Sequence, residues 1–234
     1  MRARVVGAGR AGGALALALE RVGWTVLASL GRGDDLSAAA HGVDLLVLGV
    51  PDPVIADVAA AVEPVADTVV AHLAGSLGLD VLAGHPRPAA LHPLVALPDA
   101  ETGAARLAGG AWFAVAGDPL VEQVVADLGG HAFTVADEDR TRYHAAAVIA
   151  SNHLVALLGQ VERVAPDGVP LEAFLALVRG TVDNVAALGP AAALTGPVAR
   201  GDWATVERHL AALPDDERPA YEAMVAQARR LVDG

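Results

Sequence analysis

The chain contains neither cysteine nor lysine among its 234 residues. Without cysteine it cannot form disulfides, thiolate nucleophiles or cysteine-ligated metal sites, and its redox compartment cannot be inferred from thiols. All 16 basic residues are arginines, which excludes Schiff-base chemistry and a lysine acid or base. We therefore expect no metal site and no lysine-dependent mechanism.

Positive charge is also scarce, because 16 basic residues face 28 acidic ones and the formal net charge is -12. Such a charge repels a phosphate backbone, so nucleic acid is not an expected partner. The longest apolar stretch, residues 145–158, is interrupted by Ser-Asn-His at 151–153 and is shorter than the roughly 20 residues of a bilayer span. It predicts a buried helix and no membrane association. Residues 1–6 hold no apolar signal core, which predicts a cytoplasmic protein.

The first part of the chain alternates short β-branched runs with alanine-rich stretches, a pattern typical of βαβ units in a parallel sheet. The predicted strands are Ala3–Val6, Thr25–Ala28, Leu45–Leu48, Thr68–Ala71, Ala89–Leu91, Trp112–Val115 and Ala132–Val135. The helices predicted between them are Ala11–Val22, Pro53–Val62 and Leu120–Leu128. The fold class is therefore α/β, a Rossmann parallel sheet domain followed by an all-α C-terminal domain.

The pattern changes near residues 136–139, after which only long helical periods remain. We place the boundary there, with a Rossmann domain over residues 1–136 and a helical substrate or dimerisation domain over 137–234. The acidic residues Asp137, Glu138 and Asp139 favour a helix N-terminus, and that helix can run to about Val164. Further predicted helices are Leu171–Leu188, Trp203–Leu213 and Asp215–Val232.

A GxGxxG motif, Gly7-Ala8-Gly9-Arg10-Ala11-Gly12, follows the first strand and opens a helix. In a dinucleotide site, Gly7 permits the tight turn, Gly9 lets the backbone approach a diphosphate, and Gly12 allows close packing of helix on strand. The helix N-terminus adds free N–H groups and a positive dipole end. The alternative is a glycine-rich turn that binds nothing.

The residues after the second strand favour NADP over NAD. An NAD site usually has an acidic residue there, whereas this chain has Ser29 and Arg32, a hydroxyl and a guanidinium suited to a 2'-phosphate. Arg10 can add charge beside the phosphates, although Arg32 can also be a solvated loop cation. After the third strand, Val50, Pro51 and Asp52 are expected to line the cofactor, even though the prolines could simply begin the next helix.

Several motifs resemble those of a family of small Rossmann-like proteins whose C-terminal half is a domain of unknown function. They are Gly7 to Gly13, Gly49-Val50-Pro51-Asp52, Leu91-His92-Pro93-Leu94, Tyr143 to Asn152 and Leu194-Thr195-Gly196-Pro197. The wider superfamily that the chain resembles is that of 6-phosphogluconate dehydrogenase, with a Rossmann domain and a helical dimerisation domain. Some members of the small family resemble a second type of ketopantoate reductase, and the better-known type relies on a lysine that is missing here.

The resemblance also indicates candidate catalytic residues. Gly75-Ser76 and His92-Pro93 resemble a serine and a histidine of prephenate dehydrogenases that act on the substrate hydroxyl. Histidine suits a proton donor near neutral pH. Ser76 could instead cap a short helix, and His92 could belong to a plain turn.

A polar stripe on the first C-terminal helix supplies two further candidates. At about 100° per residue, His144 and Ser151 share a face and Asn152 lies about 80° away. By resemblance this helix carries catalytic side chains, so His144 and Asn152 are candidates. The alternative is a buried histidine and asparagine satisfied by backbone groups.

These observations predict an NADPH-dependent oxidoreductase that transfers a hydride to the carbonyl or imine carbon of a small carboxylic acid. His92 or His144 would donate the proton, while Ser76 and Asn152 would orient the substrate. The resemblance suggests ketopantoate as the acid. Alternatives are NAD-dependent oxidation of a prephenate-like hydroxyl and a dinucleotide sensor without turnover. Alanine-rich helices with few aromatic residues bury little area each, which predicts a homodimer.

Overall fold

The computed structural model describes residues 1–233, which form two compact units. The first unit is Met1–Ser151 and the second begins at Asn152. The first unit contains the sheet and the candidate site, and the second contains helices only.

One seven-stranded sheet forms the centre of the first unit, in the order β2-β1-β3-β4-β5-β6-β7. Its strands are β1 (Arg2–Val6), β2 (Thr25–Val26), β3 (Leu45–Leu48), β4 (Val69–His72), β5 (Pro88–Pro93), β6 (Trp112–Gly117) and β7 (His131–Thr134). Strands β3 and β4 are buried along their whole length, as expected where both faces of a parallel sheet are covered. All seven predicted strands are present, which confirms the α/β fold class.

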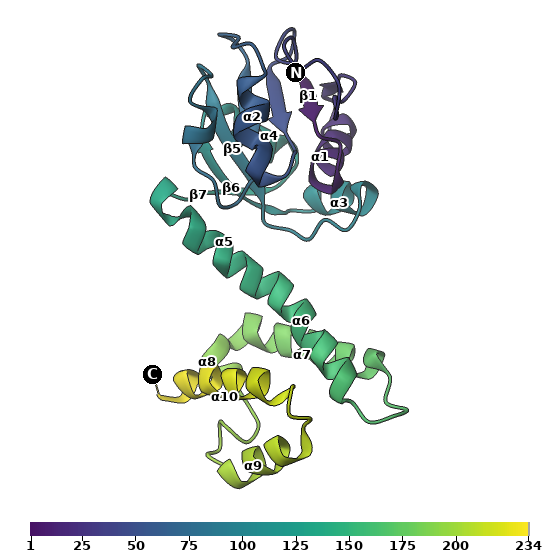
Figure 1. Cartoon of the computed structure of the whole chain (residues 1–234), viewed down its shortest axis with the longest axis vertical. Coiled ribbons are helices and arrows are strands. Elements are labelled where there is room, and N and C mark those ends of the chain that lie inside the picture. Colours follow the sequence, from purple (N-terminus) through teal and green to yellow (C-terminus); the bar gives the residue numbers. More distant parts are fainter. Residues whose placement is uncertain (234) are drawn as a thin grey trace. The chain divides into compact units, whose positions relative to one another are not determined.

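Helices cover both faces of this sheet (Figure 1). The helical elements of the first unit are α1 (Arg10–Arg21), η1 (Asp52–Val54), α2 (Ile55–Ala60), η2 (Leu79–Leu82), α3 (Ala100–Leu107), α4 (Leu120–Asp127), η3 (Asp137–Asp139) and α5 (Arg140–Val148). One apolar core joins α1, α3 and α4 to the sheet, and a second joins α2 and η2 to the opposite face. In Figure 1, α1 and α3 lie side by side.

The sheet is not parallel throughout, and this corrects the prediction. Strand β5 pairs with β6 in antiparallel orientation, whereas β6 and β7 are parallel to each other. The carboxyl ends of β1, β3, β4 and β5 therefore share one edge, and those of β6 and β7 lie at the other. Helix α3, which the sequence pattern did not predict, lies in the connection between β5 and β6.

The second unit consists of α6 (Leu154–Val164), α7 (Leu171–Leu188), α8 (Pro190–Ala193), α9 (Trp203–Ala212) and α10 (Arg218–Asp233). A π-helical turn, Ile149–His153, connects α5 to α6. Within this unit Arg163 pairs with Glu217, whose side chain is 10% exposed, and Gln160 donates a hydrogen bond to the Glu217 carbonyl at 2.9 Å. These contacts hold α6 against the segment that precedes α10.

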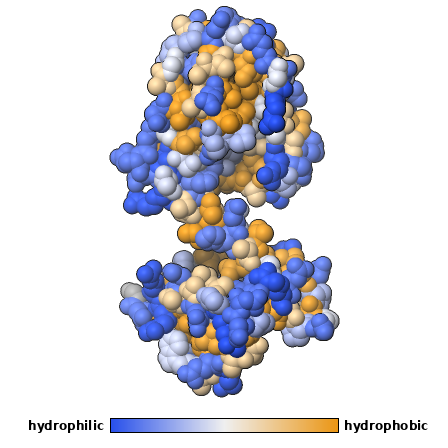
Figure 2. Space-filling view, viewed as in Figure 1, coloured by the Kyte–Doolittle hydropathy of each residue, from blue (hydrophilic) through white to orange (hydrophobic). Residues whose placement is uncertain are grey.

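Large apolar side chains are exposed on the helices of the second unit, and Figure 2 shows apolar surface on them. They include Leu154, Val155, Leu177, Val182, Val185 and Leu188. The predicted buried helix over residues 145–158 is therefore wrong within a single chain, because α6 holds no buried residue. By length and composition alone, the helical stretch Asp137–Val164 would be sufficient to cross a membrane.

The two compact units divide between Ser151 and Asn152, whereas the predicted domains divide after Ala136. The predicted position follows the last strand, which ends at Thr134. Helix α5 belongs to the first unit, because Tyr143 contacts His92 at the end of β5 and His144 lies beside Gly75, between β4 and η2.

Candidate active site

Three glycines of the candidate dinucleotide site pack backbone against backbone. Gly7 has a φ of +90°, and a Cβ atom on it would lie 2.8 Å from the carbonyl oxygen of Gly49. A Cβ on Gly12 would lie 2.1 Å from the carbonyl oxygen of Gly7. A Cβ on Gly49 would in turn lie 2.8 Å from the Gly12 Cα. Any side chain at these positions would push the β1 turn, α1 and the end of β3 apart.

Gly9 differs from those three, because a Cβ built on it meets no atom within 4 Å among residues 1–233. Gly9 is also the N-cap of α1, and no side chain in the described part of the chain caps that helix. The N–H groups of Arg10, Ala11 and Gly12 begin the helix, and Gly9 and Arg10 are exposed. Open space beside uncapped N–H groups at a positive helix end fits a diphosphate.

The segment after β2 is tied to this glycine turn. The Gly7 N–H donates to the Leu30 carbonyl at 2.8 Å, and Leu30 forms a β-bridge with Val6. Ser29 and Arg32, on either side of Leu30 and Gly31, are exposed. Asp34 lies farther along the loop, where its carboxylate accepts a hydrogen bond from the Gly31 N–H at 2.7 Å. The loop thus presents the predicted hydroxyl and guanidinium beside the turn.

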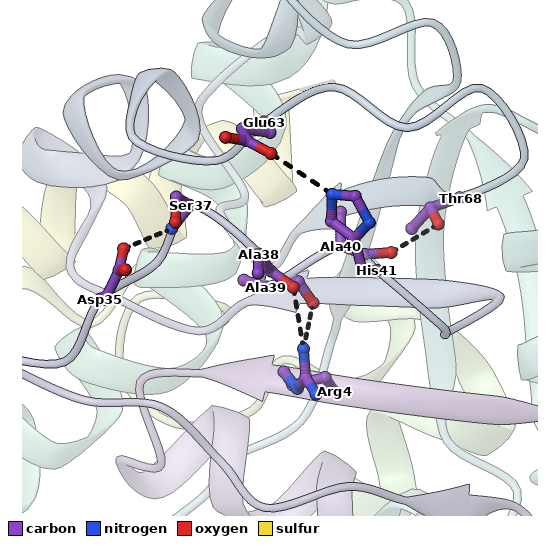
Figure 3. Close-up of polar contacts among 9 residues, drawn as sticks. All are labelled: Arg4, Asp35, Ser37, Ala38, Ala39, Ala40, His41, Glu63 and Thr68. Atoms are coloured by element: carbon purple, nitrogen blue, oxygen red, sulfur yellow. Dashed lines mark hydrogen bonds and ion pairs between the residues drawn. The ribbon is translucent and has the colours of Figure 1, made fainter.

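The connection from this loop to β3 contains no helix and is held by side chains that bond to its backbone (Figure 3). Arg4 Nη1 donates to the carbonyls of Ala38 and Ala39, at 3.2 and 2.7 Å. The Thr68 hydroxyl donates to the Ala40 carbonyl at 2.8 Å. These side-chain donors satisfy backbone carbonyls that a helix would satisfy with its own N–H groups. They therefore fix the segment that follows Arg32.

The predicted cofactor and substrate residues after β3 and β4 meet in the structure. Val50 packs beside Gly7, where its Cγ1 would lie 2.8 Å from a Cβ on that glycine, and Pro51 precedes η1. Asp52 is the first residue of η1, and its Oδ2 accepts a hydrogen bond from the Ser76 hydroxyl at 3.1 Å. Ser76 is not the N-cap of η2, which is Gly78. The Asp52–Ser76 pair therefore lies on the ligand edge of the sheet.

His92 and His144 converge on the backbone of Gly75. A Cβ on Gly75 would lie 2.6 Å from His144 Nδ1 and 2.8 Å from His92 Nε2. The two imidazole rings meet edge to face, with centroids 5.9 Å apart. The sequence thus predicted three members of one cluster, since Ser76 is the next residue to Gly75.

Tyr143 is a member of this cluster that the prediction of catalytic residues missed. Its hydroxyl oxygen lies 2.7 Å from His92 Nδ1, and the rings are nearly perpendicular. Phe133 of β7 packs against Tyr143 with ring centroids 5.7 Å apart, in another edge-on contact. The phenol is therefore held between β5 and β7.

Arg140 is a second missed member, and its side chain is fully buried. Its Nε donates to Asp137 Oδ1 at 3.3 Å, while Nη1 and Nη2 find no hydrogen-bond partner among residues 1–233. Asp137 Oδ2 accepts from the Leu79 N–H at 3.3 Å, so this pair joins the start of α5 to the segment after Gly75. Helical spacing could have indicated Arg140, because residues i, i+3 and i+4 put it on one face with Tyr143 and His144.

Burial dominates the protonation of this cluster. Burial, together with the neighbouring His144 and Arg140, lowers the pKa of His92 to about 4, while Asp52 acts in the opposite direction. Burial also raises the pKa of the Tyr143 phenol above its usual value, with Arg140 opposing. Both groups are therefore uncharged near neutral pH.

His72, at the end of β4, is a third residue that the predictions missed. Its Nε2 lies 3.1 Å from the Gly78 carbonyl, and its Nδ1 accepts from the Ala74 N–H at 3.2 Å. Burial lowers its pKa, which favours the neutral form that can donate at one nitrogen and accept at the other. His72 thereby fixes both ends of the segment that carries Gly75 and Ser76.

Asn152 and Ser151 lie in the π-helical turn Ile149–His153, and both are exposed. The predicted common face of His144 and Ser151 assumed a regular α-helix at 100° per residue. A π turn contains more residues per turn, so that angle does not hold beyond Val148. Such turns in α-helices are frequent at functional sites.

The second unit has its own pocket, of about 630 Å³, between α7, α8 and α10. Leu177, Thr181, Asn184, Leu194, Thr195 and Leu231 are among its lining residues. Thr195, of the motif Leu194-Thr195-Gly196-Pro197, is thus on the wall of this pocket. In the described part of the chain no group of three His, Asp or Glu residues is placed to hold a metal ion.

Solved structures share this fold over the full chain length. A Bacteroides fragilis protein assigned as an NADP oxidoreductase is 20% identical, with a TM-score of 0.81 and 98% of each chain covered. A Thermotoga maritima protein is 24% identical, with a TM-score of 0.76 over 99% of this chain and 98% of the other. An Aspergillus terreus reductive aminase is 15% identical, with a TM-score of 0.73 over 98% and 93% of the two chains.

No curated protein matches the chain in sequence. Residues 113–228 match the family model described as "Domain of unknown function (DUF2520)". The match begins within β6 and continues through the helices of the second unit. The matched segment thus includes the last two strands of the sheet and most of the helices.

Proposed function

We propose that the protein is an NADP-dependent oxidoreductase. The observation that carries this proposal is the open space at Gly9, beside the uncapped N-terminus of α1. Ser29 and Arg32 are exposed on the loop tied to the same turn, where they can receive a 2'-phosphate. The fold is shared with an assigned NADP oxidoreductase and with a reductive aminase in complex with NADPH4.

The proposed reaction is reduction of a carbonyl or imine carbon of a small carboxylic acid. When bound, NADPH supplies the hydride. The four parallel strands β1, β3, β4 and β5 are followed or ended by the candidate residues, which are Gly7, Gly49 to Asp52, Gly75-Ser76 and His92. The glycine turn and the polar cluster therefore share one edge of the sheet. Ser76 can orient the substrate heteroatom through its hydroxyl, which Asp52 positions. Asn152 is a further candidate for that role.

The acid itself is proposed from resemblance. Ketopantoate is the first candidate, and imine substrates belong in the same test because the reductive aminase crystal contained cyclohexanone and allyl amine. Oxidation of a prephenate-like hydroxyl by NAD is an alternative that the Ser76 and His92 pair favours. The third possibility, a dinucleotide sensor, would use the glycine turn without turnover.

The test combines binding and turnover on the full-length protein. NADPH and NADH are titrated separately while fluorescence of the three tryptophans and the melting temperature are followed. Consumption of NADPH at 340 nm is then measured with 2-oxo acids, ketopantoate among them, and with imines formed in situ. We expect NADPH binding and turnover with at least one substrate. Binding without turnover would leave the sensor, and absence of binding would remove the proposal.

We also propose that the second unit pairs with a second copy of the chain, in a cytoplasmic protein without a membrane span. Leucine and valine side chains on α6 and α7 are exposed in the single chain and form the kind of apolar surface that monomers rarely leave open. The first turns of the stretch Asp137–Val164 carry five charged residues, which a bilayer would exclude. Sedimentation as a monomer at micromolar concentration would contradict the pairing of two copies. Recovery of the intact protein in the membrane fraction would contradict a cytoplasmic protein without a membrane span.

A further inference from the structure

We propose that Tyr143 is the catalytic acid of the reaction and that His92 is its proton-relay partner. This inference rests on the proposed function and identifies the group that supplies the proton. Its basis is the 2.7 Å contact between the Tyr143 hydroxyl and His92 Nδ1, in a cluster bounded by Gly75 and Phe133. The sequence motifs had instead indicated His92 or His144 as the donor.

The buried position of His92 disfavours it as the donor. With a pKa of about 4, only about one imidazole in a thousand carries the extra proton at pH 7. A neutral imidazole is a much weaker acid than a phenol, and a tyrosine hydroxyl is an established general acid. Tyr143 is half-buried, keeps its proton near neutral pH, and can therefore offer it to a substrate beside Gly75.

The proposed role requires one direction of the hydrogen bond between the two residues. In the proposed relay, His92 Nδ1–H donates to the Tyr143 oxygen, which leaves the phenol proton free to point at the substrate. As the carbon atom gains its hydride, the phenol proton moves to the substrate oxygen or nitrogen. The Nδ1 proton of His92 then moves to the phenolate oxygen while Nε2 takes a proton from water. Water thus supplies the one proton that carbonyl or imine reduction needs and leaves hydroxide. Exchange of the imidazole proton with water then returns it from Nε2 to Nδ1.

Other charged and titratable groups face this pair from the surrounding elements. Arg140 and His144 come from α5, His72 from the end of β4, and Asp52 from η1. The two cationic or imidazole neighbours on α5 disfavour a proton on His92, whereas Asp52 favours one. Arg140 also stabilises the phenolate that forms transiently on Tyr143.

The chain offers a matched control for the Tyr143–His92 pair. Tyr221 and His209 form the same contact in the second unit, with the hydroxyl oxygen 2.7 Å from Nδ1 and ring centroids 5.9 Å apart. His209 and its contact are exposed. Tyr143→Phe and Tyr221→Phe therefore remove the same hydrogen bond, one within the cluster and one on a surface.

The first experiment measures turnover and cofactor affinity in both variants. Tyr143→Phe is expected to lower kcat by at least about 100-fold, the loss typical of a general acid, with the NADPH Kd and melting temperature close to those of the parent. Tyr221→Phe should retain parental kcat. A Tyr143→Phe variant within threefold of parental kcat would overturn the assignment of Tyr143, whereas a parent protein without any turnover would overturn the proposed function.

The second experiment needs no cofactor and determines the direction of the hydrogen bond. Because the chain has only two tyrosines, Tyr221→Phe leaves Tyr143 as the single phenol in an absorbance titration. If His92 donates, adding His92→Phe raises the pKa of Tyr143, since the phenolate loses a donor. A lowered pKa would show that Tyr143 donates to His92 and would overturn the relay. Long-range ¹H–¹⁵N spectra should independently show the proton on Nδ1 of His92.

Discussion

The carbonyl oxygen of Gly7 occupies the place where a side chain on Gly12 would begin, 2.1 Å from the position of its Cβ. Gly9, between them in the sequence, faces open space instead. The same motif therefore contains one glycine required by packing and one that leaves room for a ligand, and substitution can separate the two roles.

Gly12→Ala should destabilise the protein, because a methyl group there collides with backbone that cannot move aside. We expect a loss of about 1–3 kcal/mol, as for other overpacked interiors. Gly9→Ala should leave the melting temperature of the free protein unchanged, since Gly9 has extended φ and ψ values that alanine adopts freely. It should nevertheless weaken NADPH binding by about tenfold or more, the loss of one or two charge-assisted backbone bonds. Calorimetric titration checks the affinity, and equal affinity in Gly9→Ala and parent would contradict a diphosphate at this turn.

Arg32 is expected to determine the preference for NADP. Arg32→Ala should weaken NADPH binding by about tenfold to a hundredfold, because a charge-assisted hydrogen bond to the 2'-phosphate is lost. Its effect on NADH should be small. Arg2→Ala is a suitable control, because Arg2 is exposed at the start of β1, the opposite end from the glycine turn. Equal losses for both cofactors would show that Arg32 does not contact the 2'-phosphate.

The stability of the protein should depend on pH through His92. The pKa of His92 falls from 6.5 to about 4 on folding. Between these pH values the unfolded chain binds a proton at His92 and the folded chain does not, so acid lowers the free energy of unfolding. The resulting contribution is fully present above pH 6.5 and is lost as the pH falls towards 4. It amounts to about 3 kcal/mol.

His92→Gln should remove this dependence, which urea denaturation from pH 4 to 7.5 can measure. The difference in unfolding free energy between parent and variant should narrow as the solution becomes more acidic. His131→Gln, a substitution of an exposed histidine on β7, should leave the parental slope intact. Parallel curves for parent and His92→Gln would refute the depressed pKa.

Arg140 should tune His92 without being needed for folding. Burial and His144 lower the pKa of His92 most, and Arg140 adds to them. Arg140→Met should therefore raise the pKa of His92 towards 6.5. The fall of kcat/KM on the acid side of its pH profile should then occur at a higher pH. Removal of a buried cation with two unpaired nitrogens should leave the melting temperature equal or higher.

The pKa of His92 can be measured in parallel by NMR titration of its imidazole. Arg142→Met is the matched substitution, because Arg142 is on the same helix with its side chain 83% exposed. An unchanged pKa of His92 in Arg140→Met would show that the guanidinium does not act on it.

The seven strands could be predicted because buried parallel strands consist of short β-branched runs between helical segments. The direction of β6 could not, since alternation and composition are the same in either orientation. Helix α3 was hidden by Gly103, a poor helix former that is present because a Cβ there would lie 2.6 Å from the Ala14 Cβ of α1. Its start carried a readable signal, the Asp99 side chain that accepts from the Thr102 N–H at 2.7 Å.

The sequence predicted those parts of the candidate site that lie within one short motif, and it missed the contacts between residues far apart in the chain. Gly7, Gly9 and Gly12 follow a strand in one contiguous motif. The contact of Tyr143 with His92 joins residues 51 positions apart, and nothing in either neighbourhood indicates the other. The orphaned nitrogens of Arg140 are likewise a property of packing, which no periodicity encodes.

The reversal of β6 and β7 has a consequence for dissection of the molecule. The chain leaves β7 at the edge remote from the glycine turn, and α5 carries it back past η2 towards the end of β5. A fragment cut at Ala136 would keep all seven strands and yet lose Arg140, Tyr143 and His144. Gene fusions and truncations that end with the last strand would therefore remove three side chains of the cluster to which we assign the proton transfer.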